Sequence, residues 1–162
     1  MNDRAAGDAF ENLRLDNQLC FALYAATHAI TRAYRSLLTD LGITYPQYLV
    51  LLVLWENDNV PVGEIAKRLQ LDAAALTPLV KRLETLGLIA RTRDTRDERV
   101  VRISLSAQGL SLKPRAASVQ NEVRCKTGME VGEFYNLRAQ LHNLVKALSQ
   151  GEEEQSKEIP TA

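Results

Sequence analysis

Apolar side chains recur at spacings of three and four residues near both ends of the chain, which predicts long amphipathic helices there. The first helix is expected over residues 15–41, before Gly42, and the last over about 130–148, where the spacing forms a heptad seam. Two long apolar stripes are hard to bury inside one small domain, so we expect them to form a homodimer interface. The stripes consist of Leu19, Leu23, Ala26, Ile30, Ala33 and Leu37, and of Phe134, Leu137, Leu141, Leu144 and Leu148.

The middle of the chain predicts three shorter helices. Residues 48–55 are apolar nearly all round, which indicates a buried central helix, and Pro46 is well placed to begin it. Two further helices are expected over 63–69 and 73–86, joined by a tight turn. Asp72 is the expected N-cap of the second of these helices.

A β-hairpin is predicted next. Residues 88–92 and 100–105 have strand-like sequences on either side of the charged segment 93–99. The order helix, turn, helix and hairpin is that of a winged helix-turn-helix. A further helix is expected over 106–126, bent or broken at Pro114.

The expected fold class is therefore mainly α with a small β-hairpin, in which a winged helix-turn-helix core lies between long dimerisation helices. One domain is expected over 15–149, because a chain of 162 residues is the size of one domain and is large enough to bury its own core. Its parts are dimerisation helices at 15–41 and 106–149 and the winged helix-turn-helix at 43–105, with a flexible tail over 1–14 and an acidic disordered tail over 150–162.

Composition and charge exclude several classes of protein. The 162 residues are 46% hydrophobic and 25% charged, as in an ordinary soluble globular chain, and two cysteines are too few for a disulfide framework. Residues 1–15 lack the apolar core of a signal peptide and no apolar run is long enough to span a membrane, so a cytoplasmic protein is expected. The net charge is zero, but residues 61–102 hold nine basic and six acidic side chains. This asymmetry fits a DNA-binding face and, equally, a solvated basic surface.

Cys20 is the first candidate for chemistry. If Asp16 is the N-cap of the first helix, Cys20 lies at the positive end of the helix dipole, where a thiolate is favoured. A thiolate attacks a peroxide oxygen and becomes a sulfenic acid. The competing interpretation is an inert, buried thiol. His28 and His142 have no Cys, Asp or Glu at ligand spacing, so neither a metal site nor a cofactor is expected.

Four segments together resemble the MarR family of dimeric winged-helix regulators. They are GEIAKRL (63–69), LTPLVKRLETLGLI (76–89), RDTRDER (93–99) and LSAQG (105–109), and each corresponds to a different element in the right order. The segment TYPQYLVLLVLWE (44–56) is similar to a narrower branch, the OhrR type, which senses organic hydroperoxides.

The resemblance implies roles for four residues. Cys20 matches the sensing cysteine, Tyr34 and Tyr45 match its hydrogen-bonding partners, and Cys125 matches the resolving cysteine of the two-cysteine members. Tyr34 follows Cys20 by fourteen residues, about 21 Å along a straight helix, so a tyrosine that bonds this sulfur must belong to the other subunit of an antiparallel dimer. The implied function is a homodimeric repressor that binds a pseudo-palindromic double-stranded DNA operator. It leaves the operator when an organic hydroperoxide oxidises Cys20, followed by an intersubunit disulfide with Cys125.

Residues 73–86 form the expected recognition helix, about 21 Å long and able to lie in a major groove. Arg96 is best placed to enter a minor groove, and Asp94 is expected to brace the wing through an arginine. Taken one at a time, each basic residue is as easily a solvated surface charge. The candidate DNA contacts are Ala73, Ala74, Thr77, Lys81, Arg82, Arg93, Asp94, Arg96 and Arg99.

Three alternatives stay open on the sequence alone. The first is a MarR-type repressor released by a non-covalent phenolic or small aromatic ligand, with Cys20 idle. The second is a thiol peroxidase, which would need recycling chemistry; no C-x-x-C motif is present, so an enzyme is not expected. The third is a winged module without a DNA role, whose DNA affinity would lack a steep dependence on salt.

Overall fold

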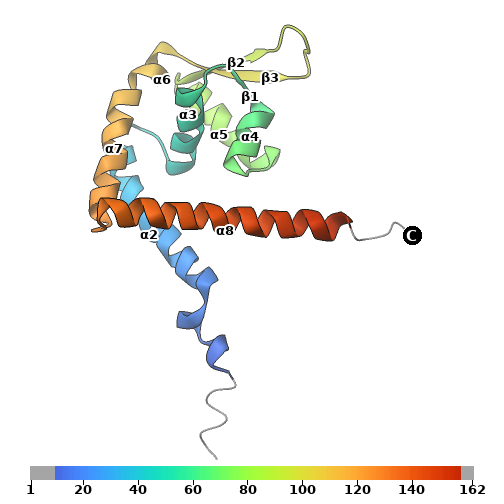
Figure 1. Ribbon diagram of the computed structural model, residues 1–162. Coiled ribbons are helices and arrows are strands. Elements are labelled where there is room, and N and C mark those ends of the chain that lie inside the picture. Colours follow the sequence, from blue (N-terminus) through green and yellow to red (C-terminus); the bar gives the residue numbers. More distant parts are fainter. Residues whose placement is uncertain (1–9, 158–162) are drawn as a thin grey trace, which may run out of the picture. The chain divides into compact units, whose positions relative to one another are not determined.

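The computed structural model describes residues 10–157, and their elements are labelled in Figure 1. The chain divides into two units, one ending at Val123 and the other beginning at Arg124. In chain order the elements are η1 (Glu11–Leu13), η2 (Leu15–Asn17), α2 (Leu19–Thr39), α3 (Tyr45–Glu56), β1 (Val60–Pro61), α4 (Val62–Leu69), α5 (Ala73–Thr85), β2 (Ile89–Arg93), β3 (Val101–Leu105), α6 (Ala107–Ser111), α7 (Lys113–Lys126) and α8 (Val131–Lys157).

Helix α3 lies at the centre of the first unit. The side chains of Val50, Leu51 and Leu54 are completely or almost completely buried, as the continuous apolar run predicted. The helix begins after Thr44, whose backbone N–H donates to the Gln47 side-chain oxygen at 2.9 Å, which satisfies a donor that the helix leaves unpaired.

The winged helix-turn-helix is confirmed. Gln70 is the C-cap of α4, and its φ of 53° turns the chain. Asp72 is the N-cap of α5, and its carboxylate accepts from the Ala75 backbone N–H at 2.6 Å. Strands β2 and β3 pair antiparallel, with Ile89 opposite Leu105. Figure 1 shows the sheet on one side of α3, α4 and α5, with the β2–β3 loop extending beyond them.

The sheet contains a third strand that the sequence did not predict. Strand β1 pairs antiparallel with β3, with Val60 opposite Ile103, so β3 is the middle strand. Two residues with a proline give no alternating pattern, and only pairing with β3 makes them a strand. This strand joins the end of α3 to the wing.

The start of the first long helix corrects one prediction. Asp16 is not the N-cap, because it lies inside η2. The Gln18 backbone N–H donates to the Leu15 carbonyl at 3.0 Å, which closes this short helix, so α2 begins only at Leu19. Cys20 is therefore the second residue of α2.

Gly109 explains how α6 packs on the hairpin. A Cβ at this position would lie 2.0 Å from the Leu88 carbonyl oxygen, so no larger residue fits without a backbone shift. The Gly109 carbonyl in turn accepts from the buried Trp55 indole N–H at 3.0 Å. The predicted break at Pro114 is also observed, because α6 ends at Ser111 and α7 begins at Lys113.

The second unit contains the long helix α8. The sequence predicted disorder from residue 150, whereas the helix continues to Lys157, in keeping with the helix-forming residues Glu, Gln and Lys beyond Gly151. Residues 1–9 and 158–162 of the predicted tails lie outside the described residues. Within residues 10–157 no helix combines the length and the apolar character needed to cross a membrane. Apolar side chains exposed on α8 are Val131, Tyr135, Leu137, Val145 and Leu148.

Candidate DNA interface and sensor residues

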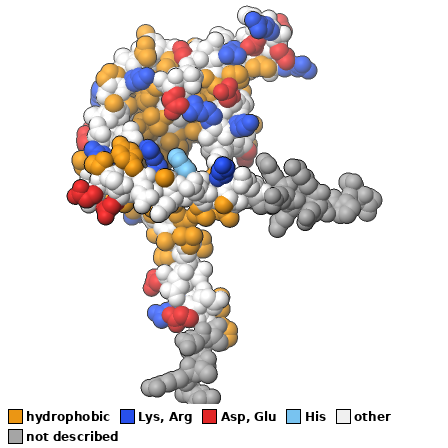
Figure 2. All heavy atoms as spheres, viewed as in Figure 1, with side chains coloured by type: hydrophobic (Ala, Val, Ile, Leu, Met, Phe, Trp, Pro, Cys, Tyr) orange, Lys and Arg blue, Asp and Glu red, His pale blue; other side chains and the backbone are white. Residues whose placement is uncertain are grey.

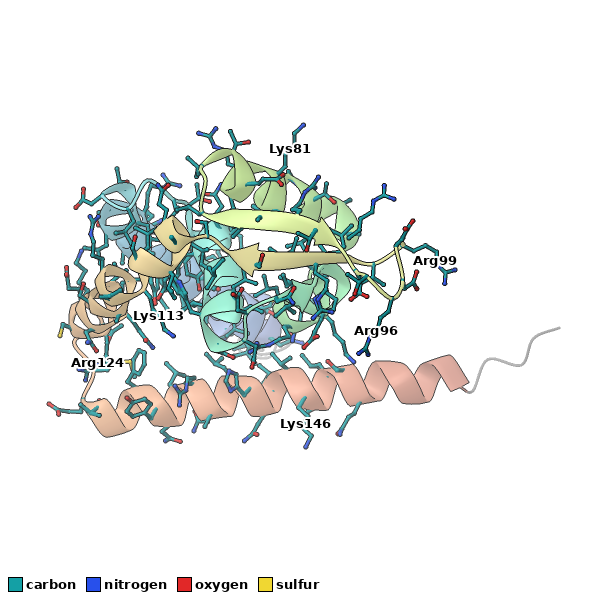
Figure 3. The ribbon with its side chains drawn as sticks, turned by 90° about the horizontal axis from the view of Figure 1, so that it is seen from above. Lys81, Arg96, Arg99, Lys113, Arg124 and Lys146 are labelled. Carbon is teal, nitrogen blue, oxygen red and sulfur yellow. The ribbon has the colours of Figure 1, made fainter. Side chains whose placement is uncertain are left out.

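Helix α5 separates a buried face from an exposed one. Leu76, Val80 and Leu83 are buried in the core, which fixes the rotation of the helix. Lys81 extends away from the domain in Figure 3. The exposed residues include all the candidate contacts predicted on this helix, namely Ala73, Ala74, Thr77, Lys81 and Arg82.

The Thr77 hydroxyl is already engaged within α5. Its Oγ1 donates to the Ala73 carbonyl at 2.6 Å, so the hydrogen of this hydroxyl points along the helix. The oxygen can still accept a hydrogen bond. The first turn of α5 presents three exposed alanines, Ala73, Ala74 and Ala75, whose methyl groups suit thymine methyls, with Lys81 and Arg82 further along the helix.

The exposed arginines of the wing differ in whether a carboxylate compensates their charge. Arg96 and Arg99 extend from the β2–β3 loop in Figure 3. The Arg99 guanidinium forms two hydrogen bonds to the Asp97 carboxylate, at 3.0 and 3.2 Å, so its charge is partly compensated. Arg93 and Arg96 are exposed, and their side chains have no hydrogen bond or ion pair with residues 10–150. Arg93 and Arg96 are therefore the available cations of the wing.

Asp94 braces the wing through an arginine, as predicted. Its carboxylate pairs with Arg102 at 3.1 Å and also accepts from the Arg96 backbone N–H at 2.8 Å. These bonds, first of all the one from Arg96, lower the pKa of Asp94 below its ordinary value, so it is ionised at neutral pH. Figure 2 shows Lys, Arg, Asp and Glu side chains together over this end of the molecule.

The two cysteines are both free thiols and both exposed. Cys20 lies in the first turn of α2, beside the exposed apolar side chains of Leu19 and Tyr24. Cys125 lies in the last turn of α7, between Arg124 and Lys126, and belongs to the second unit. Within a single chain, Cys20 is therefore not the buried, inert thiol that the sequence also allowed.

Tyr34 and Tyr45 lie together, although they come from different helices. Their ring centroids are 4.8 Å apart, and Tyr48 completes the cluster at 5.7 Å from Tyr34. Burial, followed by the neighbouring hydroxyls of Tyr48 and Tyr45, raises the pKa of Tyr34 to about 12. Burial also raises the pKa of Tyr45. Both phenols keep their protons at neutral pH and can donate a hydrogen bond.

Cys20 of the same chain cannot reach this tyrosine cluster. It is separated from Tyr34 by fourteen residues of one continuous helix, or about 21 Å. The structure of one chain thus brings together two of the three residues expected to form the sensor and leaves the sulfur apart from them.

Two functional candidates were missed from the sequence. Tyr48 follows Tyr45 by one helical turn, and this spacing of three could have indicated a shared face. Arg102 lies in the middle strand of the wing and binds both Asn59 and Asp94. The only sequence signal that could have indicated it is that Arg102 is the one charged residue of β3.

A small hollow lies between α3 and α7 in the first unit. It is lined mainly by Tyr48, Leu52, Trp55 and Ala116, and its volume is about 240 Å³. Pockets for drug-sized ligands usually enclose about 300–1,000 Å³, so this hollow is small for such a molecule. Among the described residues, no group of His, Cys, Asp and Glu is arranged to hold a metal ion.

Comparison with known proteins identifies relatives along most of the chain. A sequence model of the MarR family matches residues 43–101. The HTH-type transcriptional regulator TtmR of Methylorubrum extorquens is 54% identical over 130 residues, which cover 80% of this chain and 65% of TtmR. The organic hydroperoxide resistance transcriptional regulator of Bacillus subtilis is 41% identical over 141 residues, which cover 87% of this chain and 96% of the relative.

Solved structures of similar shape include AbfR of Staphylococcus epidermidis in two states. Reduced AbfR bound to DNA is 34% identical and has a TM-score of 0.74, covering 86% of this chain and 96% of AbfR. Disulfide-formed AbfR, also 34% identical, has a TM-score of 0.59 and covers 86% of this chain and 98% of that chain.

Proposed function

Because the chain belongs to the MarR family of DNA-binding transcriptional regulators, we propose that it is a homodimeric repressor controlled by organic hydroperoxides. In this proposal, Cys20 is the sensor and Cys125 the resolving cysteine. The observation that carries it is that Cys20 is exposed at the start of α2, while Tyr34, about 21 Å further along the same helix, packs against Tyr45 of α3. The relative from Bacillus subtilis, an organic hydroperoxide resistance regulator, supports the same effector.

The proposed DNA interface consists of α5 and the wing. The exposed face of α5 would lie in the major groove, where the Ala73 and Ala74 methyl groups contact bases and Lys81 and Arg82 contact bases or phosphates. Arg96, which has no carboxylate partner within residues 10–150, would enter the adjacent minor groove, with Arg93 and Arg99 near the phosphates. Thr77 and Asp94 complete the proposed surface.

The proposed dimer brings the sensor together. If α2 of two subunits run antiparallel, the start of one helix lies near the Tyr34 region of the other. Exposed apolar side chains on α2, including Leu19, Tyr24 and Ile30, would then be covered by the partner. Figure 2 shows hydrophobic side chains along the visible part of this helix.

The proposed chemistry consists of a substitution at a peroxide oxygen followed by a substitution at sulfur. The Cys20 thiolate attacks an oxygen of the hydroperoxide, so that an S–O bond forms while the O–O bond breaks, and the alkoxide leaves and takes a proton to become an alcohol. The Cys125 thiolate of the partner subunit then attacks the sulfenic acid sulfur; the disulfide forms and hydroxide leaves. The Tyr34 and Tyr45 hydroxyls of the partner subunit stabilise the Cys20 thiolate by donating hydrogen bonds, because both stay protonated at neutral pH.

The experiment that tests this function measures release from DNA. A duplex recovered from a randomised library by the wild-type protein is titrated with cumene hydroperoxide, and binding is followed by fluorescence anisotropy. We expect the wild-type protein to leave the duplex and the Cys20→Ser variant to stay bound. Equal release of both proteins would overturn the redox mechanism in favour of a ligand-controlled repressor.

Non-reducing electrophoresis tests the second step. After hydroperoxide treatment the wild-type protein should migrate as a covalent dimer, whereas Cys125→Ser should remain monomeric and hold a sulfenic acid that dimedone traps. A monomer band for the oxidised wild-type protein would show that no disulfide joins the subunits.

A further inference from the structure

We propose that Arg102 is the positioning residue of the wing: it ties the loop that carries Arg96 to the turn before β1, and so sets where Arg96 meets DNA. This inference rests on the proposed DNA-binding role of the wing. It concerns a residue of the middle strand that lies behind the exposed arginines of the loop.

The Arg102 guanidinium uses all three of its nitrogens. Its Nε donates to the Asn59 side-chain oxygen at 3.0 Å, one terminal nitrogen donates to the Asn59 carbonyl, and the other donates to the Asp94 carboxylate at 3.1 Å. The side chains of Arg102 and Asp94 are only 30% and 19% exposed. A planar fork with fixed donors is well suited to hold three acceptors in one arrangement.

Arg102 is placed for this role by the sheet register. It lies opposite Pro61 of β1 on one side and opposite Thr92 of β2 on the other, at the end of the sheet from which the wing loop leaves. A side chain on a flanking strand could reach only one of the two turns. The middle strand is the one from which both are accessible.

Asn59 is shaped to receive the guanidinium. Its φ of 56° lies in the left-handed region, which asparagine adopts more readily than most residues. In this conformation both its side-chain oxygen and its carbonyl accept from Arg102. The preceding Asp58 carboxylate also accepts from the Leu105 backbone N–H at 2.8 Å, so the turn is joined to β3 at two places.

Asp94 carries the connection into the wing loop. One of its oxygens binds Arg102, while the other accepts the Arg96 backbone N–H at 2.8 Å. The Asp94 backbone N–H donates to the Val100 carbonyl at 2.8 Å and closes the base of the loop. The backbone of Arg96 is thus two hydrogen-bonding steps from Arg102. Asn59, Asp94, Arg96 and Arg102 line one polar hollow.

The remaining arginine pairs of this region do not make such a connection. Arg99 pairs with Asp97 inside the loop and is 91% exposed, and Arg91 pairs with Glu84 of α5 at 3.1 Å. Arg91 therefore offers a matched control, because its substitution removes one positive charge and one ion pair from the same sheet without releasing the wing loop.

The first test uses the DNA-free protein. Hydrogen–deuterium exchange is measured for wild type, Arg102→Gln and Arg91→Gln. We expect the amides of residues 94–100 to exchange about tenfold faster in Arg102→Gln, as for the loss of a charged hydrogen bond, and to be unchanged in Arg91→Gln. Unchanged exchange in Arg102→Gln overturns the positioning role, whatever the DNA affinity.

The second test measures affinity for the selected duplex in a double-mutant cycle with Arg96→Gln. Arg96→Gln and Arg102→Gln should each weaken binding by about tenfold, and the double variant should be little weaker than either. Additive losses would overturn the inference, because Arg102 would then act independently of Arg96. Arg102→Lys, which cannot reproduce the fork, should restore less than half of the lost binding free energy; full rescue would also overturn it.

The cycle distinguishes this inference from the proposed function. If wild type binds the duplex and Arg96→Gln binds equally well, the wing contact of the proposed function is wrong and the positioning role is lost with it. If Arg96→Gln weakens binding but Arg102→Gln does not, only the positioning role is overturned.

Discussion

An antiparallel dimer that builds its sensor across two subunits makes a prediction about mixed dimers. A heterodimer is prepared with Cys20→Ser in one subunit and Tyr34→Phe in the other, each subunit carrying its own affinity tag. Its single Cys20 belongs to the Tyr34→Phe chain. If the sensor forms across the dimer, this cysteine meets the intact Tyr34 of the other chain and should react with hydroperoxide at the wild-type rate.

The expected size of the effect follows from the structure. Within one chain, about 21 Å separates Cys20 from Tyr34, whereas a hydrogen bond to the sulfur needs atoms within about 3–4 Å. A hydrogen bond to a charged group contributes about 1.5–3 kcal/mol, and each 1.36 kcal/mol changes a rate tenfold. The Tyr34→Phe homodimer should therefore be oxidised between about 10-fold and about 150-fold more slowly than the wild type.

The assay traps sulfenic acid with dimedone and follows its formation by mass spectrometry. Tyr135→Phe is the control, because Tyr135 is exposed on α8 and is outside the tyrosine cluster. A heterodimer that reacts as slowly as the Tyr34→Phe homodimer would refute the arrangement, since the sulfur would then depend on the tyrosine of its own chain.

Three further predictions concern the fold and the ionisation of the site. Gly109→Ala should lower the free energy of unfolding by about 1–3 kcal/mol or more, because its Cβ meets the Leu88 carbonyl at 2.0 Å, whereas Gly63→Ala, with nothing within 4 Å, should be neutral or stabilising in urea denaturation. Asp72→Ala should cost about 1 kcal/mol through the lost cap of α5 and Asp72→Asn much less, both measured by thermal unfolding. Tyr34 should titrate near pH 12 in an ultraviolet absorbance titration compared with Tyr34→Phe. Its raised pKa contributes stability that is complete below pH 10.0 and is lost as the pH rises toward 12; ionisation near 10 would contradict the observed burial.

The sequence determined those parts of the protein whose signals are local. The apolar run of α3 has no polar face, so burial was the only stable solution. Asp72 caps α5 because its carboxylate accepts the unpaired backbone N–H three residues later, an interaction that depends only on neighbouring residues. Hairpin, recognition helix and the break at Pro114 follow from the same kind of short-range pattern.

Tertiary structure decided what depends on residues far apart in the chain. Asn59 and Arg102 are 43 positions apart, and only the pairing of β1 with β3 brings them together. The tyrosine cluster likewise requires the packing of α2 on α3. The start of α2 was missed for a different, local reason, because the short helix η2 immediately before it contains Asp16. A periodic pattern indicates which face of a helix or strand is buried, but not which other element covers that face. The free energy of a contact between distant segments depends on both segments, so the pattern of one segment cannot predict the contact.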